Sequence, residues 1–323
     1  MPVLRLLKRH YPQSEIHWWL DANLMPLLDG DPDLAGIIPF QRKRWASIHR
    51  WPEIASSIRK MRRQRFDVAI DLQGLARSSM FAWLANAELT VGLDNLREGA
   101  REGARGFYDV TPNRALPNTH AVDRYLAVLS VLKVPVHWDF EWLPIRPEVA
   151  AKVREKWQIG TGPWIALLPG ARWDNKRWPA EYFAAVAKRM SENPVARFVI
   201  LGSRDEKGLG ETIAEQNPGR CLNLSGETTL WEMIEWIRLC QVMITNDTGP
   251  MHVAAALNKP VVALFGPTNP LNTGPYRQLQ NVIQRTDLPC VPCMKGHCTY
   301  KEPLACLHLI TPAKVCQKAA SVV

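Results

Sequence analysis

Residues 245–270 read TNDTGPMHVAAALNKPVVALFGPTNP and contain the alternation of strand, turn and helix that decides the fold. The apolar run QVMITND, which leads into this stretch, predicts a buried strand ending near Thr245. The helical pattern PMHVAAALN follows directly, and a second β-branched run, PVVALFG, begins at Pro260. Near-continuous apolar strands separated by single helices predict a parallel sheet with helices on both of its faces.

The same alternation extends over most of the chain, and we therefore predict an α/β fold. Further strands are expected at EIHWWLD (15–21), FDVAIDLQG (66–74), PWIALLPG (163–170) and RFVILGS (197–203). A length of 323 residues suggests two domains, and the proline-rich stretch 134–150 is the best junction. Residues 3–9 predict a helix, so the strand that normally opens a doubly wound domain is missing.

Composition narrows the class of protein. With 46% hydrophobic and 22% charged residues, the chain is neither disordered nor fibrous. It has no apolar run long enough for a transmembrane helix. The charges at Arg5, Lys8 and Arg9 argue against a secretory signal. Together with seven unevenly spaced cysteines, this favours the reducing cytoplasm.

The positive charge is concentrated rather than spread. Residues 41–65 hold nine basic side chains against the single acid Glu53, a net +8 within a chain of net charge +9. This window is either a solvated basic helix or a patch for an anionic partner. Nucleic acid is the least favoured partner, because no recognition motif is present. Trp45 and Trp51 lie among these cations and suit a membrane surface or a sugar face.

The turn in 245–270 is suited to an anion. Asp247 or Thr248 can cap the following helix, and Pro250 fits its first turn. Gly249 allows a ligand to approach the backbone, and the free N–H groups of a helix start attract a diphosphate. His252, one turn in, can face the same ligand. The alternative is an ordinary cap with a buried histidine.

Three more strand ends carry polar or small residues. The turn 266–270 (GPTNP) follows the next strand and is expected on the same rim of the sheet. The loop 167–179 carries the basic residues Arg172, Lys176 and Arg177. Cations there belong beside the phosphates of a nucleotide, unless they are simply solvated. After a further strand, Asp205 or Glu206 can bind a sugar hydroxyl.

Several segments resemble the lipopolysaccharide heptosyltransferases of glycosyltransferase family 9. These are PGARWDNKRWP, ITNDTGPMHVAAALNKPVVALFGPTNP and DLPCVPCMKGHC, and weaker likeness covers nearly the whole chain. The resemblance implies a GT-B architecture, with two Rossmann-like domains whose parallel sheets face a cleft. It implies an acceptor domain over 1–145 and a nucleotide-sugar domain over 146–323 that ends in a helix.

The resemblance also implies the site residues. Those expected at the ADP-heptose donor are Gly170, Ala171, Arg172, Lys176, Glu206, Asp247, Thr248, Gly249 and His252. Those expected at an anionic Kdo2-lipid A or inner-core acceptor are Arg42, Lys43, Arg44, Arg101 and His120. No cofactor and no nucleic acid is expected, and the acceptor implies peripheral contact with the inner face of a Gram-negative inner membrane.

The implied reaction is an inverting, metal-independent displacement. Lys176 and the helix start after Asp247 would stabilise the leaving diphosphate, while a carboxylate takes the acceptor proton. The family's general-base aspartate would lie upstream of Met1. We expect further reading frame there, and we do not assign the role to Asp71. The alternatives are a catalytically impaired or binding-only relative, and a GT-B sugar-nucleotide epimerase. The segment DNLREGARE leans toward transfer of the first heptose.

Four cysteines cluster near the carboxyl terminus, in the spacing C-x2-C-x4-C-x7-C. They are Cys290, Cys293, Cys298 and Cys306. One CxxC pair with two more thiols could bind structural zinc, but the second half lacks paired spacing. Reduced thiols in a surface loop are the favoured interpretation, and we expect no metal at the reaction centre.

Overall fold

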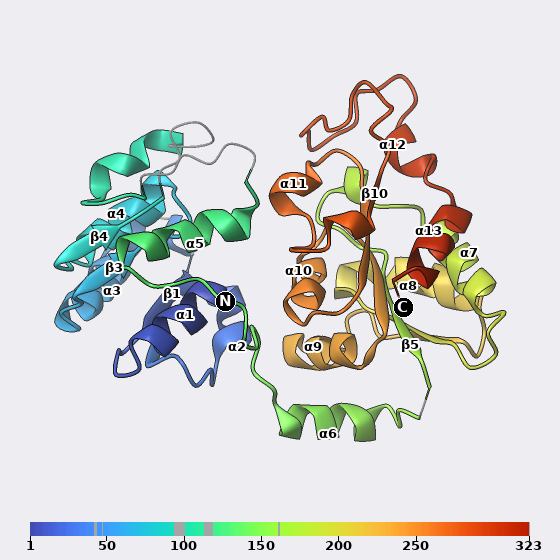
Figure 1. Cartoon of the computed structure of the whole chain (residues 1–323), viewed down its shortest axis with the longest axis horizontal. Coiled ribbons are helices and arrows are strands. Elements are labelled where there is room, and N and C mark those ends of the chain that lie inside the picture. The colour runs from blue at the N-terminus through green and yellow to red at the C-terminus, as the bar shows by residue number, and fades with distance from the viewer. Residues whose placement is uncertain (42–43, 47, 94–100, 113–118, 161, 323) are drawn as a thin grey trace. The chain divides into compact units, whose positions relative to one another are not determined.

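A computed structural model describes residues 1–323 except 42–43, 47, 94–100, 113–118, 161 and 323, and except the side chains of 46, 48, 101 and 102. The chain divides into two compact units, Met1–Trp142 and Leu143–Val323 (Figure 1). The division falls inside the proline-rich stretch 134–150.

The second unit is built on one six-stranded sheet of order β10-β9-β8-β5-β6-β7, in which every pairing is parallel. The strands are β5 (Trp164–Leu168), β6 (Arg197–Ile200), β7 (Cys221–Asn223), β8 (Val242–Asn246), β9 (Val261–Phe265) and β10 (Val282–Gln284). The four predicted strands in this half are confirmed. The short edge strands β7 and β10 were not predicted.

Helices cover both faces of this sheet (Figure 1). They are α6 (Pro147–Lys156), α7 (Ala180–Met190), α8 (Lys207–Glu215), α9 (Leu230–Leu239), α10 (Gly249–Ala256), α11 (Pro270–Thr273), α12 (Ala305–His308) and α13 (Pro312–Ala320). Helix α7 packs against α8 and α13 on one face, and α9 packs against α10 and α6 on the other. Every residue of β5, β8 and β9 is buried, as expected for strands covered on both sides.

Among its described residues, the first unit holds two pairs of parallel strands rather than one continuous sheet. One pair is β1 (His17–Asp21) with β2 (Gly36–Phe40), and the other is β3 (Val68–Ile70) with β4 (Leu89–Val91). The helices are α1 (Pro2–His10), α2 (Met25–Leu28), α3 (Trp51–Arg63), α4 (Ala76–Leu84) and α5 (Ala121–Val131). The predicted helix at 3–9 and the strand that follows it are confirmed as α1 and β1.

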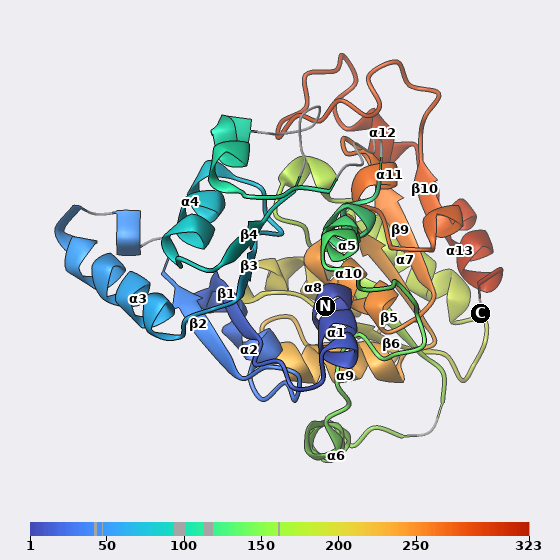
Figure 2. The ribbon, with the colours of Figure 1, turned by 60° about the vertical axis from the view of Figure 1, so that its left-hand side comes forward.

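Each strand pair has its own small core. Helix α1 lies beside α5 (Figure 2), and Leu6 and Leu129 pack with Val91 of β4. Around β1 and β2, Phe40 and Phe81 form the second core. Trp45 belongs to this core, with its ring 6.2 Å from that of Phe81.

The tryptophans of the basic window therefore have different environments. The interpretation of Trp45 as an exposed interface residue is wrong, because it packs with its aromatic neighbours, whereas the Trp51 residue is 64% exposed. Within the part of the chain that the structure describes, no helix has the length and apolar character needed to cross a bilayer.

Truncation of a core side chain in the central sheet tests this packing. Phe198 of β6 is fully buried against α7, so Phe198→Ala should lower the free energy of unfolding by about 3–5 kcal/mol. Val195, two residues outside the strand and 57% exposed, provides the control, since Val195→Ala should change it by less than about 0.5 kcal/mol. Urea denaturation measures both, and equal effects would contradict this description of the core.

Candidate functional site

The strand order brings four loops to one rim of the second unit's sheet. β5 and β8 are adjacent, β9 lies beside β8, and β6 lies beside β5. Because all four strands are parallel, the segments that follow their carboxyl ends emerge on the same edge. The turns after β8 and β9 therefore share one rim, as the sequence predicted.

An ion pair joins two of these loops. Lys176 Nζ lies 2.6 Å from Asp247 Oδ2, and the side chains are only 17% and 8% exposed. The hydroxyl of Thr268, in the turn after β9, donates to the same carboxylate oxygen over 2.6 Å. The structure thus brings Lys176 and Asp247 together and adds Thr268, which the sequence analysis did not select.

The loop that carries Lys176 is fixed to the end of β8 by buried amide contacts. Asn246 Nδ2 donates to the carbonyl of Pro169 over 2.7 Å, and Asn246 Oδ1 accepts the N–H of Trp178 over 3.1 Å. Asn246 therefore holds both ends of the loop. Within it, the ammonium of Lys176 lies 4.7 Å from the ring centre of Trp173, a cation–π contact.

Glu206 reaches the same rim from the end of β6. Its carboxylate fills the space beside Gly170, where an added Cβ would lie 2.0 Å from Oε1. Glu206 Oε2 accepts the N–H of Ser203 over 2.7 Å, which fixes the carboxylate. Gly170 and Glu206, both predicted at the donor, are thus in contact. Ala171 is buried beside them, and Arg172 is exposed.

The start of α10 differs from the capped turn that was expected. Thr248 occupies the N-cap position but its side chain makes no capping hydrogen bond, and Asp247 turns instead to Lys176 and Thr268. A Cβ added at Gly249 would meet open space, and His252 is exposed rather than buried. The prediction that Asp247 or Thr248 caps this helix with its side chain was therefore wrong. Pro250 has no N–H, and the N–H of Met251 donates to the carbonyl of Thr248 over 3.2 Å, which leaves the N–H groups of Thr248 and Gly249 for an anion.

The predicted acceptor residues are not gathered in the part of the first unit that the structure describes. Arg42 and Lys43 lie outside the described residues, and of Arg101, which opens the 3-10 segment Arg101–Phe107, only the backbone is described. Arg44 pairs with Glu53 over 2.6 Å, and His120 is buried with its Nδ1 accepting the N–H of Val122 at the start of α5.

The basic window resolves into two parts. At its beginning, Glu53 pairs with both Arg44 and Arg50, and these guanidinium groups hold the pKa of Glu53 below its usual value. At its end, exposed cations follow one another along the last turns of α3 and beyond it. They are Arg59, Lys60, Arg62, Arg63 and Arg65. Within the described chain, none of these five forms an ion pair, so they carry five of the window's nine positive charges without a paired acid.

Asp71, at the end of β3, is fully engaged in structural hydrogen bonds. Its Oδ1 accepts the N–H groups of Gln73 and Gly74, and its Oδ2 accepts the hydroxyls of Ser78 and Tyr108. Burial raises the pKa of Tyr108, and the bond to Asp71 raises it further. Asp71 is 5% exposed and holds its loop together, which does not suit a general base that must take a substrate proton.

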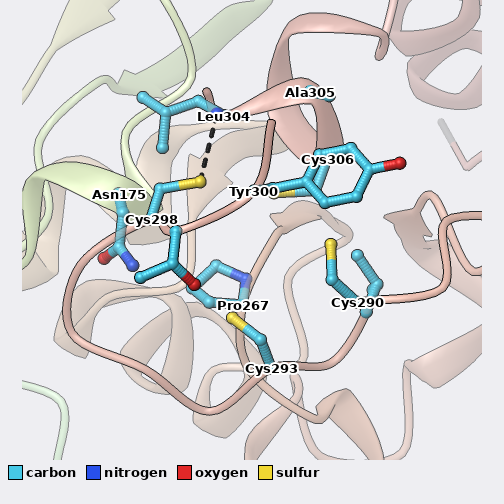
Figure 3. Close-up of a pocket in the computed structure, with 11 residues that line it drawn as sticks. Asn175, Pro267, Cys290, Cys293, Cys298, Tyr300, Leu304, Ala305 and Cys306 are labelled. Carbon is cyan, nitrogen blue, oxygen red and sulfur yellow. Dashed lines mark hydrogen bonds between the residues drawn. The ribbon is translucent and has the colours of Figure 1, made fainter. Parts of the chain in front are cut away.

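Four cysteines line one small cavity of about 30 Å³ in the second unit (Figure 3). Cys290, Cys293, Cys298 and Cys306 surround it, and all seven cysteines of the chain are free thiols. Burial, followed by the proximity of the other three cysteines, raises the pKa of the Cys306 thiol to about 11.

Comparison with known proteins identifies the family. The family model described as glycosyltransferase family 9 (heptosyltransferase) matches residues 54–303. The chain belongs to glycosyltransferase family 9. It is a glycosyltransferase, and the resemblance drawn from the sequence is confirmed.

Individual relatives agree with this assignment. The chain is 33% identical to a lipooligosaccharide heptosyltransferase 2 of Haemophilus influenzae, over 90% of this chain and 85% of that protein. It is 29% identical to a lipopolysaccharide heptosyltransferase 1 of Pseudomonas aeruginosa, over 93% and 83%. The solved E. coli ADP-heptose LPS heptosyltransferase II is 26% identical, with a TM-score of 0.76 over 99% of this chain and 93% of that one. The GT-B fold predicted from the sequence is thereby confirmed.

Removal of the carboxylate from the Lys176–Asp247 pair tests whether this pair stabilises the folded chain. Asp247→Ala leaves a nearly buried ammonium without its carboxylate and should lower the free energy of unfolding by about 3 kcal/mol. The exposed pair Arg285–Asp287 has the same 2.6 Å separation, so Asp287→Ala is a matched control whose expected loss is much smaller, because solvent screens an exposed pair. Chemical denaturation measures both, and an Asp247→Ala loss no larger than the control's would show that the pair is not structural.

Proposed function

We propose that the chain transfers L-glycero-D-manno-heptose from ADP-heptose to the Kdo/heptose inner core of lipopolysaccharide. The observation that carries the proposal is the cluster of Lys176, Asp247 and Thr268 at the start of α10, on the rim where a nucleotide's diphosphate binds in doubly wound sheets. The relatives' names support the same donor and acceptor. The E. coli heptosyltransferase WaaC, with 21% identity and a TM-score of 0.76, was solved with ADP-2-deoxy-2-fluoro heptose.

In this proposal the rim stabilises the departing diphosphate. The acceptor hydroxyl attacks the anomeric carbon of the heptose and gives its proton to a carboxylate base, which this proposal does not assign to a residue. The bond from that carbon to the phosphate oxygen breaks, and configuration inverts. Negative charge develops on ADP, where the Lys176 ammonium and the N–H groups at the start of α10 can meet it. Asp247 and Thr268 act as positioning residues that hold the ammonium. These groups offer fixed positive charge, so we propose a displacement without a metal at the leaving group.

Two features of the second unit fit the nucleotide part of the donor. The carboxylate of Glu206, fixed against Gly170, can accept hydrogen bonds from ribose hydroxyls. His252 is exposed one turn from the start of α10, on the element that would carry the diphosphate. We propose Glu206 at the ribose and His252 near the phosphates or the sugar.

Replacement of Lys176 distinguishes a specific role in ADP binding from the general effect of losing one positive charge. Lys176→Met should weaken ADP binding roughly 10- to 100-fold, the value of a charge-assisted hydrogen bond, and should lower kcat on the order of 100-fold. Lys188→Met removes an exposed charge on α7 and should change neither. Calorimetry with ADP and a transfer assay with ADP-heptose and Kdo2-lipid A give the two readouts. Equal affinities of the two variants would contradict the proposed role of Lys176.

The same experiments distinguish the alternatives. Binding of ADP-heptose without transfer would favour the binding-only relative, for which the fully engaged state of Asp71 is the supporting observation. Interconversion of the sugar nucleotide without an acceptor would favour an epimerase. Transfer onto a Kdo-terminated acceptor, compared with one that already carries a heptose, decides which heptose is added.

We further propose that the exposed end of α3 contacts the anionic surface that presents the acceptor. Arg59, Lys60 and Arg63 are exposed there, and Trp51 is exposed at the other end of the helix. Basic residues near an anionic membrane contribute about 1 kcal/mol each.

Vesicle binding tests this surface. Neutralising Arg59, Lys60 and Arg63 to Gln should weaken sedimentation with vesicles of anionic phospholipid on the order of 100-fold, and added salt should reduce the wild-type binding. The control neutralises three exposed cations of the second unit, Lys152, Lys188 and Arg189, with the same change in net charge. An equal loss in both variants would mean that net charge alone, rather than this face, drives binding.

A further inference from the structure

The segment between β10 and α12 is long and has almost no core of its own. Residues 285–304 contain no helix or strand, and no side chain in this range is buried. Structureless segments of this length are uncommon in compact domains, because ordering each residue costs conformational entropy that burial must offset. Leu288 and Val291 pack part of their surface against the core of the unit, and the rest of the segment needs support other than apolar packing.

The cysteines are placed where that support would act. Cys290, Cys293 and Cys298 are half-buried within the segment, and Cys306 lies in α12, immediately after it. Figure 3 shows the four around one cavity, although they come from positions spread over 17 residues of sequence. A cavity of about 30 Å³ exceeds the roughly 10–15 Å³ that one water-sized guest needs, so it has room for a single ion.

A backbone contact completes the cluster. The N–H of Leu304 donates to Cys298 Sγ over 3.4 Å, drawn as the dashed line in Figure 3. Such N–H donors around a thiolate orient it and stabilise its charge when it is a metal ligand.

We propose that Cys290, Cys293, Cys298 and Cys306 form a structural site for one soft divalent metal ion such as Zn²⁺, which anchors residues 285–304. Four thiolates are the ligand set of closed, tetrahedral structural sites. As the side chains stand in the described chain, no three metal-ligating groups converge closely enough to hold an ion, so binding includes rotation of the thiols into the cavity that they surround. Each thiol that binds releases its proton to solvent, and the metal takes the sulfur lone pair.

The segment 285–304 contacts the loop that carries Lys176 and the turn that carries Thr268. Between Cys293 and Cys298, the N–H of Met294 donates to the carbonyl of Pro267 over 2.7 Å. The side-chain amide of Asn175 donates to the carbonyl of Lys295 over 2.8 Å. Pro267 precedes Thr268, and Asn175 precedes Lys176. The metal would therefore stabilise the loops that carry Lys176 and Thr268 through these two contacts. It would not contact the reacting atoms.

Metal titration of the reduced, full-length chain tests the site directly. After treatment with a chelator and a reductant, the chain should bind one equivalent of Co²⁺, with the visible absorption of tetrahedral thiolate coordination, and Zn²⁺ should displace it. Cys293→Ser should abolish this absorption. Cys316→Ser is the control, because Cys316 is a half-buried thiol of α13 that does not line the cavity. Absence of Co²⁺ binding by the reduced wild type would overturn the proposal, and so would equal binding by the two variants.

Two readouts keep the test valid if a cysteine variant fails to fold. With wild-type chain, Zn²⁺ should protect four of the seven thiols from a thiol reagent and slow proteolysis within 285–304. The site would be contradicted if Zn²⁺ left these thiols unprotected. It would also be contradicted if the freshly reduced chain formed a disulfide within the cluster instead of binding the metal. None of these measurements uses heptose transfer, so the metal site and the proposed activity can fail separately.

Discussion

The ion pair between Lys176 and Asp247 is the constraint around which the second unit is arranged. Its two side chains come from loops separated by 71 positions in sequence, and they meet because β5 and β8 are adjacent and parallel. An ammonium and a carboxylate this little exposed are stable only with further hydrogen bonds. Thr268 supplies one, and Asn246 fixes the loop in which the lysine lies.

The same pair places a charge where it can be used. A lysine that is held by one carboxylate and stacked on Trp173 is already ordered before a ligand arrives, so binding does not have to immobilise its long side chain. The carboxylate also lowers the net positive charge on the rim. In the proposed reaction a diphosphate would share the ammonium with Asp247, which would suit a leaving group that has to depart after reaction.

The buried central strands of the second unit could be predicted from sequence, and its two short edge strands could not. β5, β8 and β9 are continuous apolar runs because both their faces are covered, whereas β7 and β10 are three-residue edge strands with too few side chains to show a period. The rim was predictable for a related reason, since parallel topology alone brings the strand ends together. Thr268 was missed because a threonine in a turn shows no sign of its partner. The cap at Asp247 was predicted wrongly because a nearby lysine competes for the same carboxylate.

Small cores explain why the first unit was harder to interpret than the second. Its described strands form two separate pairs, so each pair buries only a few side chains, and partly buried tryptophans pack against one of the two small cores. Trp45 therefore lies against Phe81 although its neighbours in sequence are cations, and a count of charges cannot reveal this. Glu53 similarly pairs with Arg44 and Arg50, so among the described cations of the window those without an acidic partner lie at the end of α3. The location of a charged surface thus depends on which cations the fold has already paired, and that follows from packing rather than from composition.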